Sequence, residues 1–203
     1  HDLWDEWVKK HVKDQDDWQS WMDALFPVAD TEIGKLGSTI CGNSMYPEDG
    51  RGLAVNGAEV IIRCNAAINW ATRDVTVLLS RMHAVVNAAY TVNPVCGNMI
   101  MQNRESDAYT PGGYVTTGGY SCICDYFGRV ISKLEQATDT FCAAVINIES
   151  LREFRERAPD IGSKPLGMMR TEVFRKIYEK PIYPANLHLE RPEIVGKRDK
   201  IVK

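Results

Sequence analysis

One stretch constrains the fold of this chain more than any other, because an apolar run ends at a cysteine and is followed by a helix start and a second apolar run. Leu36–Ile40 has the pattern of a strand, and Cys41 follows it directly. Pro47-Glu48 suits the first turn of a helix, and Asn56-Gly57 suits its end. Glu59–Cys64 is nearly continuous in apolar residues, as buried parallel strands are. This order predicts a β-α-β unit with a thiol at the carboxyl end of a strand, where α/β folds place their sites.

A cysteine in this position permits two interpretations. A thiol at a bend near a helix N-terminus can be a nucleophile. A free cysteine is more often an inert residue of the core. The cysteine taken alone does not decide between the two, because no short motif marks it.

The rest of the chain alternates between helix-like and strand-like stretches. We expect one or two helices over residues 1–22, a strand over 25–30 joined by a tight turn to 36–40, a loop over 65–73, a helix over 74–89, a strand over 90–95, an exposed loop over 98–114, a hairpin of 118–125 with 129–132, a strand over 141–148 and a helix over 149–157.

The expected helix over residues 74–89 has an apolar stripe, which we predict to face inward. His83 lies among these apolar positions, and we interpret it as a packed or hydrogen-bonded core histidine rather than a proton carrier. The stripe consists of Val75, Leu78, Leu79, Met82, Val85 and Val86.

Composition restricts the functional classes. The chain has 203 residues, with 44% hydrophobic and 25% charged residues, which is typical of a soluble globular domain with a substantial core. Its net charge of -3 argues against nucleic-acid binding. No apolar run is long enough to cross a membrane, and the first residues do not have the pattern that we would expect of a signal peptide. The chain starts at His1 rather than Met, so we expect a fragment or a processed product.

The cysteines are too sparse for a disulfide scaffold, so we expect reduced thiols in a cytoplasmic protein. Cys122 and Cys124 would share one face of a strand, but without a His or Cys neighbour we do not expect them to bind metal. The six cysteines are Cys41, Cys64, Cys96, Cys122, Cys124 and Cys142.

The composition changes after residue 158. Residues 159–203 are rich in proline and charge and show little periodicity, which predicts an extended tail after a domain that covers residues 1–158. Pro181-Ile182-Tyr183-Pro184 is apolar and aromatic, so we expect this tail to pack on another subunit.

Several motifs occur in a fixed order over about residues 24 to 157. The turn that begins at Cys41, called the cysteine turn below, lies between the expected strand that ends at Ile40 and the expected helix that begins at Pro47. The motifs are Asp30–Gly37, Ile40-Cys41, Pro47-Glu48, Leu53–Ile61, Arg81–Ala89 followed by Tyr90–Pro94, Gly119–Ser121, and Asp125–Val130.

This series of motifs resembles the nitrilase superfamily of carbon–nitrogen hydrolases. The resemblance implies an α/β fold, specifically a four-layer α-β-β-α sandwich, of which the N-terminal portion would precede residue 1. It implies a Glu-Lys-Cys catalytic triad with Cys41 as the nucleophile and the backbone N–H of Gly42 as an oxyanion donor. It implies no metal and no organic cofactor, and it favours a homo-oligomer.

The chain departs from the family pattern at two places. Many members have an aromatic residue and an Asp after the cysteine, where this chain has Gly42 and Asn43. The family's Glu and Lys both precede the cysteine, and we expect them upstream of residue 1. Lys9 and Lys10 stand at a distance from Cys41 that some members would allow for the lysine, but their charged helical surroundings predict a solvated helix face.

Four further residues are candidates for supporting roles. Asn65 and Trp70 follow the second strand and are candidates for shaping a substrate pocket, although each could equally be simple loop structure. Glu48 and Arg81 are candidates for a pair that holds the cysteine turn structurally.

Two functional hypotheses follow from this pattern. The first is a thiol hydrolase that cleaves the carbon–nitrogen bond of a small amide, nitrile or carbamoyl compound. The second is a non-catalytic fragment or partner subunit that keeps the fold and lacks the triad. Neither involves nucleic acid or a membrane.

Overall fold

The computed structural model describes residues 2–66, 70–97, 99–102, 114–117, 119–136, 138–157 and 166–179. For residues 2, 3, 70–73, 99–102 and 114–117 it describes the backbone alone. The chain divides into two units, His1–Gly167 and Met168–Lys203. None of the described helices is both long and apolar enough to span a bilayer.

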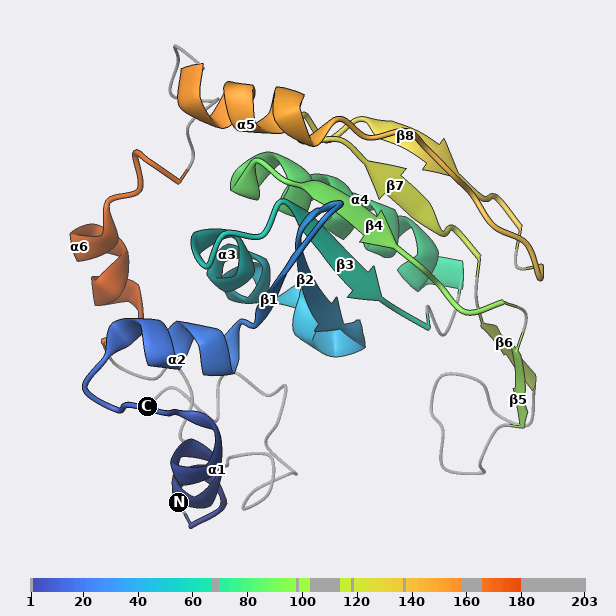
Figure 1. Ribbon diagram of the computed structural model, residues 1–203. Coiled ribbons are helices and arrows are strands. Elements are labelled where there is room, and N and C mark those ends of the chain that lie inside the picture. The colour runs from blue at the N-terminus through green and yellow to red at the C-terminus, as the bar shows by residue number, and fades with distance from the viewer. Residues whose placement is uncertain are drawn as a thin grey trace. The chain divides into compact units, whose positions relative to one another are not determined.

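Helices and strands alternate through the first unit (Figure 1). In chain order they are α1 (Asp2–His11), α2 (Trp18–Leu25), β1 (Val28–Thr31), β2 (Gly34–Ile40), the 3-10 turn η1 (Cys41–Met45), α3 (Pro47–Val55), β3 (Val60–Cys64), α4 (Trp70–Asn87), β4 (Tyr90–Asn93), β5 (Met99–Gln102), β6 (Tyr114–Thr117), β7 (Cys122–Cys124), β8 (Val130–Lys133) and α5 (Ile148–Arg157).

Six of the described strands form one sheet, in the order β1-β2-β3-β4-β7-β8. The three central strands β2, β3 and β4 are parallel, whereas β1, β7 and β8 join antiparallel to their neighbours. Ile40 at the end of β2 pairs with Cys64 at the end of β3, so these strands finish level with each other. The predicted β-α-β unit is therefore confirmed, and β5 pairs separately with β6.

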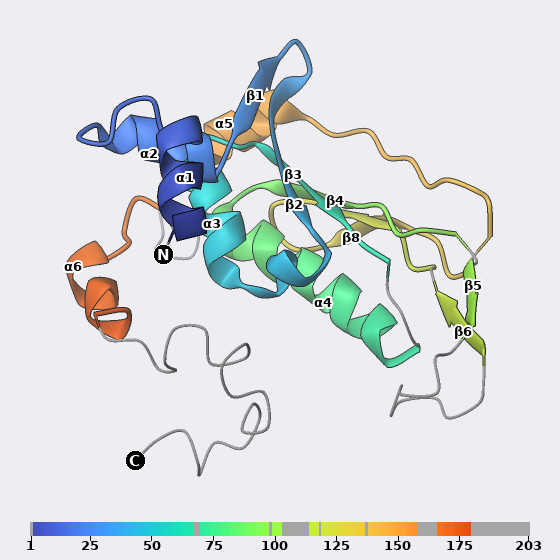
Figure 2. The same ribbon diagram turned by 90° about the horizontal axis from the view of Figure 1, so that it is seen from below.

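The sheet has two different faces. Helices α3 and α4 lie along one face and α5 covers part of the other (Figures 1 and 2). On the α5 face, Val60 and Tyr90 pack against Leu151 of α5. On the α3 and α4 face, Ile61 joins Leu53 in an apolar cluster. Successive strand residues point to opposite faces, so β3 divides its side chains between the two clusters.

The boundaries of α3 follow the predicted signals. Pro47 occupies the first turn, where its missing N–H costs nothing, and Glu48 lies near the positive end of the helix dipole. The helix ends at Val55, and the Asn56 N–H bonds to the Gly52 carbonyl. Gly57 then takes a φ of 99°, a conformation that glycine adopts without strain.

The inward face of α4 differs from the prediction. The helix begins at Trp70 rather than Asp74 and ends at Asn87. Polar residues of α4 such as Thr76 and Ser80 are buried against the sheet, whereas Leu78 is 61% exposed. The apolar stripe therefore does not face inward as a whole. The reason is that the sheet presents polar groups here, including a buried arginine described below, and these need hydrogen-bonding partners.

Two other predictions were wrong. The expected strand over residues 141–148 is not formed, because residues 140–147 carry no strand pairing before α5 begins at Ile148. The expected loop over 98–114 contains β5 and the start of β6. The predicted region 1–22 forms two helices, with Val8, Val12 and Met22 buried.

The second unit is described only over residues 168–179. Within it, α6 (Thr171–Phe174) and the 3-10 turn η3 (Arg175–Ile177) are helical, although the sequence pattern indicates an extended segment. Phe174 and Ile177 are 45% and 54% exposed. The apolar run 181–184 lies outside the described residues, so packing of the tail on another subunit stays a prediction.

Candidate active site

Cys41 lies at a sharp turn at the carboxyl end of β2. It is the first residue of η1, its thiol is free and exposed, and its backbone φ is 46°. A residue with a side chain rarely adopts this left-handed conformation, and such strain collects at functional sites. The turn lifts Cys41 out of the strand before α3 begins at Pro47.

Ser44 holds this turn from inside. It is 1% exposed, and its hydroxyl donates to the Cys41 carbonyl at 2.7 Å. Arg63 of β3 donates from Nη2 to the same hydroxyl oxygen at 2.9 Å. The backbone carbonyl of Ser44 in turn lies 2.9 Å from Nε2 of His83. Ser44 thus links the cysteine turn to β3 and to α4.

Arg63 is fully buried, with 0% exposure. Its Nη1 donates to Ser80 Oγ at 2.5 Å and to the Thr76 carbonyl at 3.1 Å, both in α4. Burial lowers the pKa of Arg63 to about 10, so the guanidinium stays charged at neutral pH. Sequence reasoning missed Arg63 and Ser44. The available signal was a single charge inside an otherwise apolar strand, which predicts a buried side chain with hydrogen-bonding partners.

His83 has the structural role that its apolar neighbours indicate. It is 0% exposed, and burial lowers its pKa, so the ring is neutral at pH 7. A carbonyl can only accept, so Nε2 carries the ring proton and donates it to the Ser44 carbonyl. This hydrogen bond ties α4 to the cysteine turn.

Two other predicted site residues lie at the same edge of the sheet as Cys41. Gly42 follows Cys41 in η1 and is exposed. Asn65 follows β3 and forms a parallel bridge with Val95, just beyond β4. Because β2 and β3 end level, Cys41 and Asn65 are the first residues beyond two neighbouring strands. Trp70 opens α4, and its side chain lies outside the described residues.

Comparison with known proteins identifies the family. A sequence model of the carbon-nitrogen hydrolase family matches residues 1–156. The chain belongs to the carbon–nitrogen hydrolase family. This family is the nitrilase superfamily that the motifs resemble, so the predicted fold class is confirmed.

Curated and solved relatives of this family are distant. A Schizosaccharomyces pombe protein named probable nitrilase is 24% identical over 75% of this chain and 52% of its own length. The citrullinase of Francisella tularensis is 26% identical over 68% of this chain and 50% of its own length. The chain spans about half the length of the curated relatives it matches.

Solved structures show the same fold. Nit3 of Saccharomyces cerevisiae, a member of branch 10 of the nitrilase superfamily, superposes with a TM-score of 0.51 at 26% identity, covering 66% of this chain and 45% of Nit3. A carbon–nitrogen hydrolase of Helicobacter pylori superposes with a TM-score of 0.58 at 22% identity, covering 74% of this chain and 51% of that protein.

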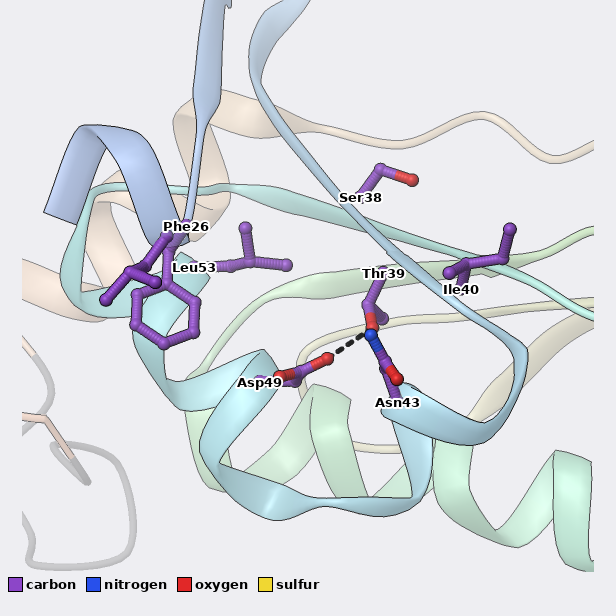
Figure 3. Close-up of a pocket in the computed structure, with 8 residues that line it drawn as sticks. Phe26, Ser38, Thr39, Ile40, Asn43, Asp49 and Leu53 are labelled. Carbon is purple, nitrogen blue, oxygen red and sulfur yellow. Dashed lines mark hydrogen bonds between the residues drawn. The ribbon is translucent and has the colours of Figure 1, made fainter. Parts of the chain in front are cut away.

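A pocket of about 310 Å³ lies beside the cysteine turn of this family member (Figure 3). Its lining includes Ile40 and Asn43, which flank Cys41 in the chain, but not Cys41 itself. Asp49 accepts a hydrogen bond from the Thr39 hydroxyl at 2.8 Å, and Asn43 lines the same pocket (Figure 3). The pocket therefore combines a carboxylate, an amide and a hydroxyl with apolar walls.

Glu48 and Arg81, the predicted supporting pair, lie in α3 and α4. Glu48 is exposed in the first turn of α3. Arg81 donates from Nε to the Gly128 carbonyl at 2.9 Å, which connects α4 to the turn between β7 and β8. A Glu48–Arg81 pair stays a prediction. Lys9 and Lys10 are exposed in the last turn of α1.

Cys122 and Cys124 are core residues of β7. They are 1% and 0% exposed and pack against Ala84 of α4. The interaction of the two neighbouring thiols lowers the pKa of Cys122 and raises that of Cys124. Within the described parts of the chain, no three His, Cys, Asp or Glu side chains are grouped as metal ligands.

Proposed function

We propose that this protein is a thiol hydrolase in which Cys41 attacks a non-peptide carbon–nitrogen bond of a small amide, nitrile or carbamoyl compound. One observation carries the proposal. In a chain that belongs to the carbon–nitrogen hydrolase family, Cys41 presents an exposed thiol from a left-handed turn at the end of a central parallel strand. An exposed thiol held in this way is available to a substrate, whereas an inert thiol would be packed in the core.

The chemistry for an amide has two stages. A general base takes the Cys41 proton, the sulfur bonds to the carbonyl carbon, and the carbonyl oxygen becomes an oxyanion. The intermediate collapses by breaking the carbon–nitrogen bond, the nitrogen takes a proton and leaves as ammonia, and a thioester remains. Water then adds to the thioester and releases a carboxylic acid and the free thiol. A nitrile would first form a thioimidate and would consume one more water.

The oxyanion needs donors that are already in place. The N–H of Gly42 is the donor that this chain supplies next to the nucleophile. The general base and a lysine ammonium are the other two parts that the family mechanism requires. Asn65 and Trp70 would shape the substrate site beside Cys41, from positions outside the pocket of about 310 Å³ that Ile40 and Asn43 line. No metal or organic cofactor takes part in this scheme.

The named activities of relatives support the range of substrates. One relative is named probable nitrilase and another citrullinase, an enzyme name that implies a ureido substrate. An amidase of Nesterenkonia with the same fold has been solved with the acetamide moiety of fluoroacetamide bonded to its active-site cysteine. Nitrile, carbamoyl and amide substrates are therefore the classes to test.

The test is ammonia release by the purified complete gene product from a panel of small amides, nitriles and ureido compounds. We expect Cys41→Ala to lower kcat/KM by roughly a thousandfold or more, as loss of a nucleophile does in other hydrolases. Cys142→Ala is the matched control, because Cys142 is a half-buried thiol after β8 whose sulfur bonds to the Ser121 carbonyl. This control should retain full activity.

Mass spectrometry of the protein with a slow substrate should detect an acyl group on the Cys41 peptide. Equal ammonia release by wild type and Cys41→Ala would overturn the proposal. No ammonia release from any substrate, with no acyl group on Cys41, would favour the alternative of a non-catalytic fragment or partner subunit.

A further inference from the structure

The peptide that joins Cys41 to Gly42 is held from the interior of the protein. The Ser44 hydroxyl donates its proton to the Cys41 carbonyl at 2.7 Å and accepts a hydrogen bond from Arg63 Nη2 at 2.9 Å. A hydroxyl has one proton to give, so the charged donor on its oxygen leaves that proton to the Cys41 carbonyl. The Ser44 hydroxyl therefore connects the Arg63 guanidinium to the Cys41 carbonyl through two consecutive hydrogen bonds.

The Arg63 side chain is held in place by α4. The guanidinium is 0% exposed and is fixed to α4 through Ser80 Oγ at 2.5 Å and the Thr76 carbonyl at 3.1 Å. Nε of Arg63 has no hydrogen-bond partner among the described residues. A buried charge is costly to leave without partners, so Arg63 keeps the hydrogen bonds of its two Nη atoms. Hydrogen bonds from a charged donor are also stronger than neutral ones. The Cys41 carbonyl is thus tied, through Ser44, to a fixed point in the core.

The geometry of the peptide unit transmits this constraint. In a planar trans peptide, the C=O of one residue and the N–H of the next point in opposite directions. The Cys41 carbonyl points inward to Ser44, which is 1% exposed. The N–H of Gly42 therefore points away from Ser44. A Cβ built on Gly42 would meet nothing within 4 Å, so the space beside Gly42 is open.

We infer that Ser44 and Arg63 are positioning residues that aim the Gly42 N–H at the oxyanion formed on attack by Cys41. The inference rests on the proposed function and deepens it. Cys41 has a left-handed backbone with a φ of 46°, which few residues hold without support. The Ser44 hydrogen bond supplies that support and orients the donor before the reaction begins, so no reorganisation is needed as charge develops.

The test compares wild type with Ser44→Ala in the complete gene product, on the best substrate found. Removing a preorganised oxyanion donor lowers kcat by roughly a hundredfold to a thousandfold in other enzymes, and here the donor remains but loses its anchor. We therefore expect kcat to fall by roughly tenfold to a hundredfold, with KM changed by less than about threefold, because the donor acts mainly in the transition state.

A second readout separates positioning from a disturbed fold. Iodoacetamide alkylates a thiolate by displacing iodide and forms no oxyanion. We expect the alkylation rate of Cys41 and its dependence on pH, followed by mass spectrometry of the Cys41 peptide, to be the same in Ser44→Ala as in wild type. A mispositioned thiol or a partly unfolded protein would change the alkylation rate together with kcat.

Two variants serve as controls. Thr31→Val removes a hydroxyl that lies outside this network and donates to the Gly34 carbonyl at 2.6 Å in the turn between β1 and β2, and it should retain wild-type kcat. Ser44→Thr keeps a hydroxyl at the anchor and should recover most of the lost kcat.

The outcomes are distinct. A loss of kcat in Ser44→Ala with unchanged alkylation supports the inference. Wild-type kcat in Ser44→Ala overturns it, and so does an equal loss in kcat and alkylation. If Ser44→Ala is fully active while Cys41→Ala is inactive, the inference fails and the proposed function stands. If Cys41→Ala is itself as active as wild type, the proposed function fails.

Discussion

Gly50 of α3 lies against two side chains of α4. A Cβ built on Gly50 would overlap the ring of His83 and lie 3.0 Å from Nδ2 of Asn87. Both side chains are 0% exposed, so neither can move aside into solvent. Gly50 therefore permits the close helix packing that brings His83 to the Ser44 carbonyl.

We expect Gly50→Ala to destabilise the protein by about 1–3 kcal/mol, the usual cost of overpacking a core. Alanine favours a helix by about 1 kcal/mol over glycine, which reduces the loss but does not reverse it. The measurement is urea unfolding followed by circular dichroism. Gly42→Ala is the matched control for stability, because its new Cβ would meet nothing within 4 Å. Equal stability of the two variants would contradict the steric argument.

At the scale of single residues, the sequence predicts positions better than partners. The place of Cys41 after a strand follows from the local pattern alone, because the apolar run and the helix start flank it. The partners of Ser44 do not follow, because Arg63 is 19 positions away and reaches it across the parallel pairing of β2 and β3. Such contacts depend on register, which local patterns do not fix.

Among the elements, α5 is joined to the start of β3 by a buried carboxylate. Glu59 is 4% exposed, and its two oxygens accept from Arg152 Nε at 2.6 Å and Nη2 at 3.1 Å. The Lys35 N–H adds a bond of 2.9 Å. Burial opposes the charge on Glu59, but the bonds from Arg152 and Lys35 outweigh it and hold the pKa of Glu59 below its ordinary value.

This lowered pKa makes the contact sensitive to acid. A carboxyl group whose pKa is lower in the folded state stabilises the fold above its unfolded pKa, about 4.3 for Glu. That contribution is lost as the pH falls through the folded pKa. We expect the difference in Tm between wild type and Glu59→Gln to be largest near pH 7 and to shrink as the pH is lowered from about 4.3.

Thermal unfolding between pH 7 and pH 3 measures the difference in Tm. Asp30→Asn is the control, because Asp30 is a largely exposed carboxylate 3.9 Å from Lys35 Nζ, and pairs of this kind contribute little. A difference between wild type and Glu59→Gln that stayed constant over this pH range would contradict the assignment of the effect to the Glu59 charge.

The elements themselves were predictable to different degrees. The limits of α3 follow from Pro47 and Asn56-Gly57, which act locally. The inward face of α4 did not follow from its apolar stripe, because two polar residues of the sheet need partners on that face. Arg63 donates hydrogen bonds to Thr76 and Ser80, and Thr91 donates one to Ser80. Residues 140–147, before α5, have strand-like side chains but do not pair with a strand. Strand pairing depends on residues far apart in the sequence, so a local pattern does not predict it.

In the molecule as a whole, the two faces of the sheet differ in chemistry. The α3 and α4 face carries the hydrogen-bonded groups that hold the cysteine turn. The opposite face carries apolar side chains of β2, β3 and β4, which together with the segment before α5 line a pocket of about 550 Å³. The alternation of strands and helices predicts the α/β class, but the strand order and the chemistry of each face arise from the assembled sheet.

The division of the chain after Gly167 leads to a prediction for the complete gene product. The apolar clusters on both faces of the sheet are built from residues before Gly167, so the first unit has its own core. Residues 168–203 include exposed apolar side chains such as Phe174 and Ile177. We propose that these residues contact another copy of the chain.

We expect truncation after Gly167 to shift the Tm measured by circular dichroism by less than about 4 °C, a change of under about 1 kcal/mol for a domain of this size. The molar mass from light scattering should fall by more than the mass of the deleted residues, because copies of the chain separate. Phe174→Ser with Ile177→Ser in the full chain should have the same effect on association without shortening the protein. An oligomer that keeps its number of subunits after truncation would show that the contact between copies lies in the first unit, since removing the tail would then have left every intersubunit contact in place.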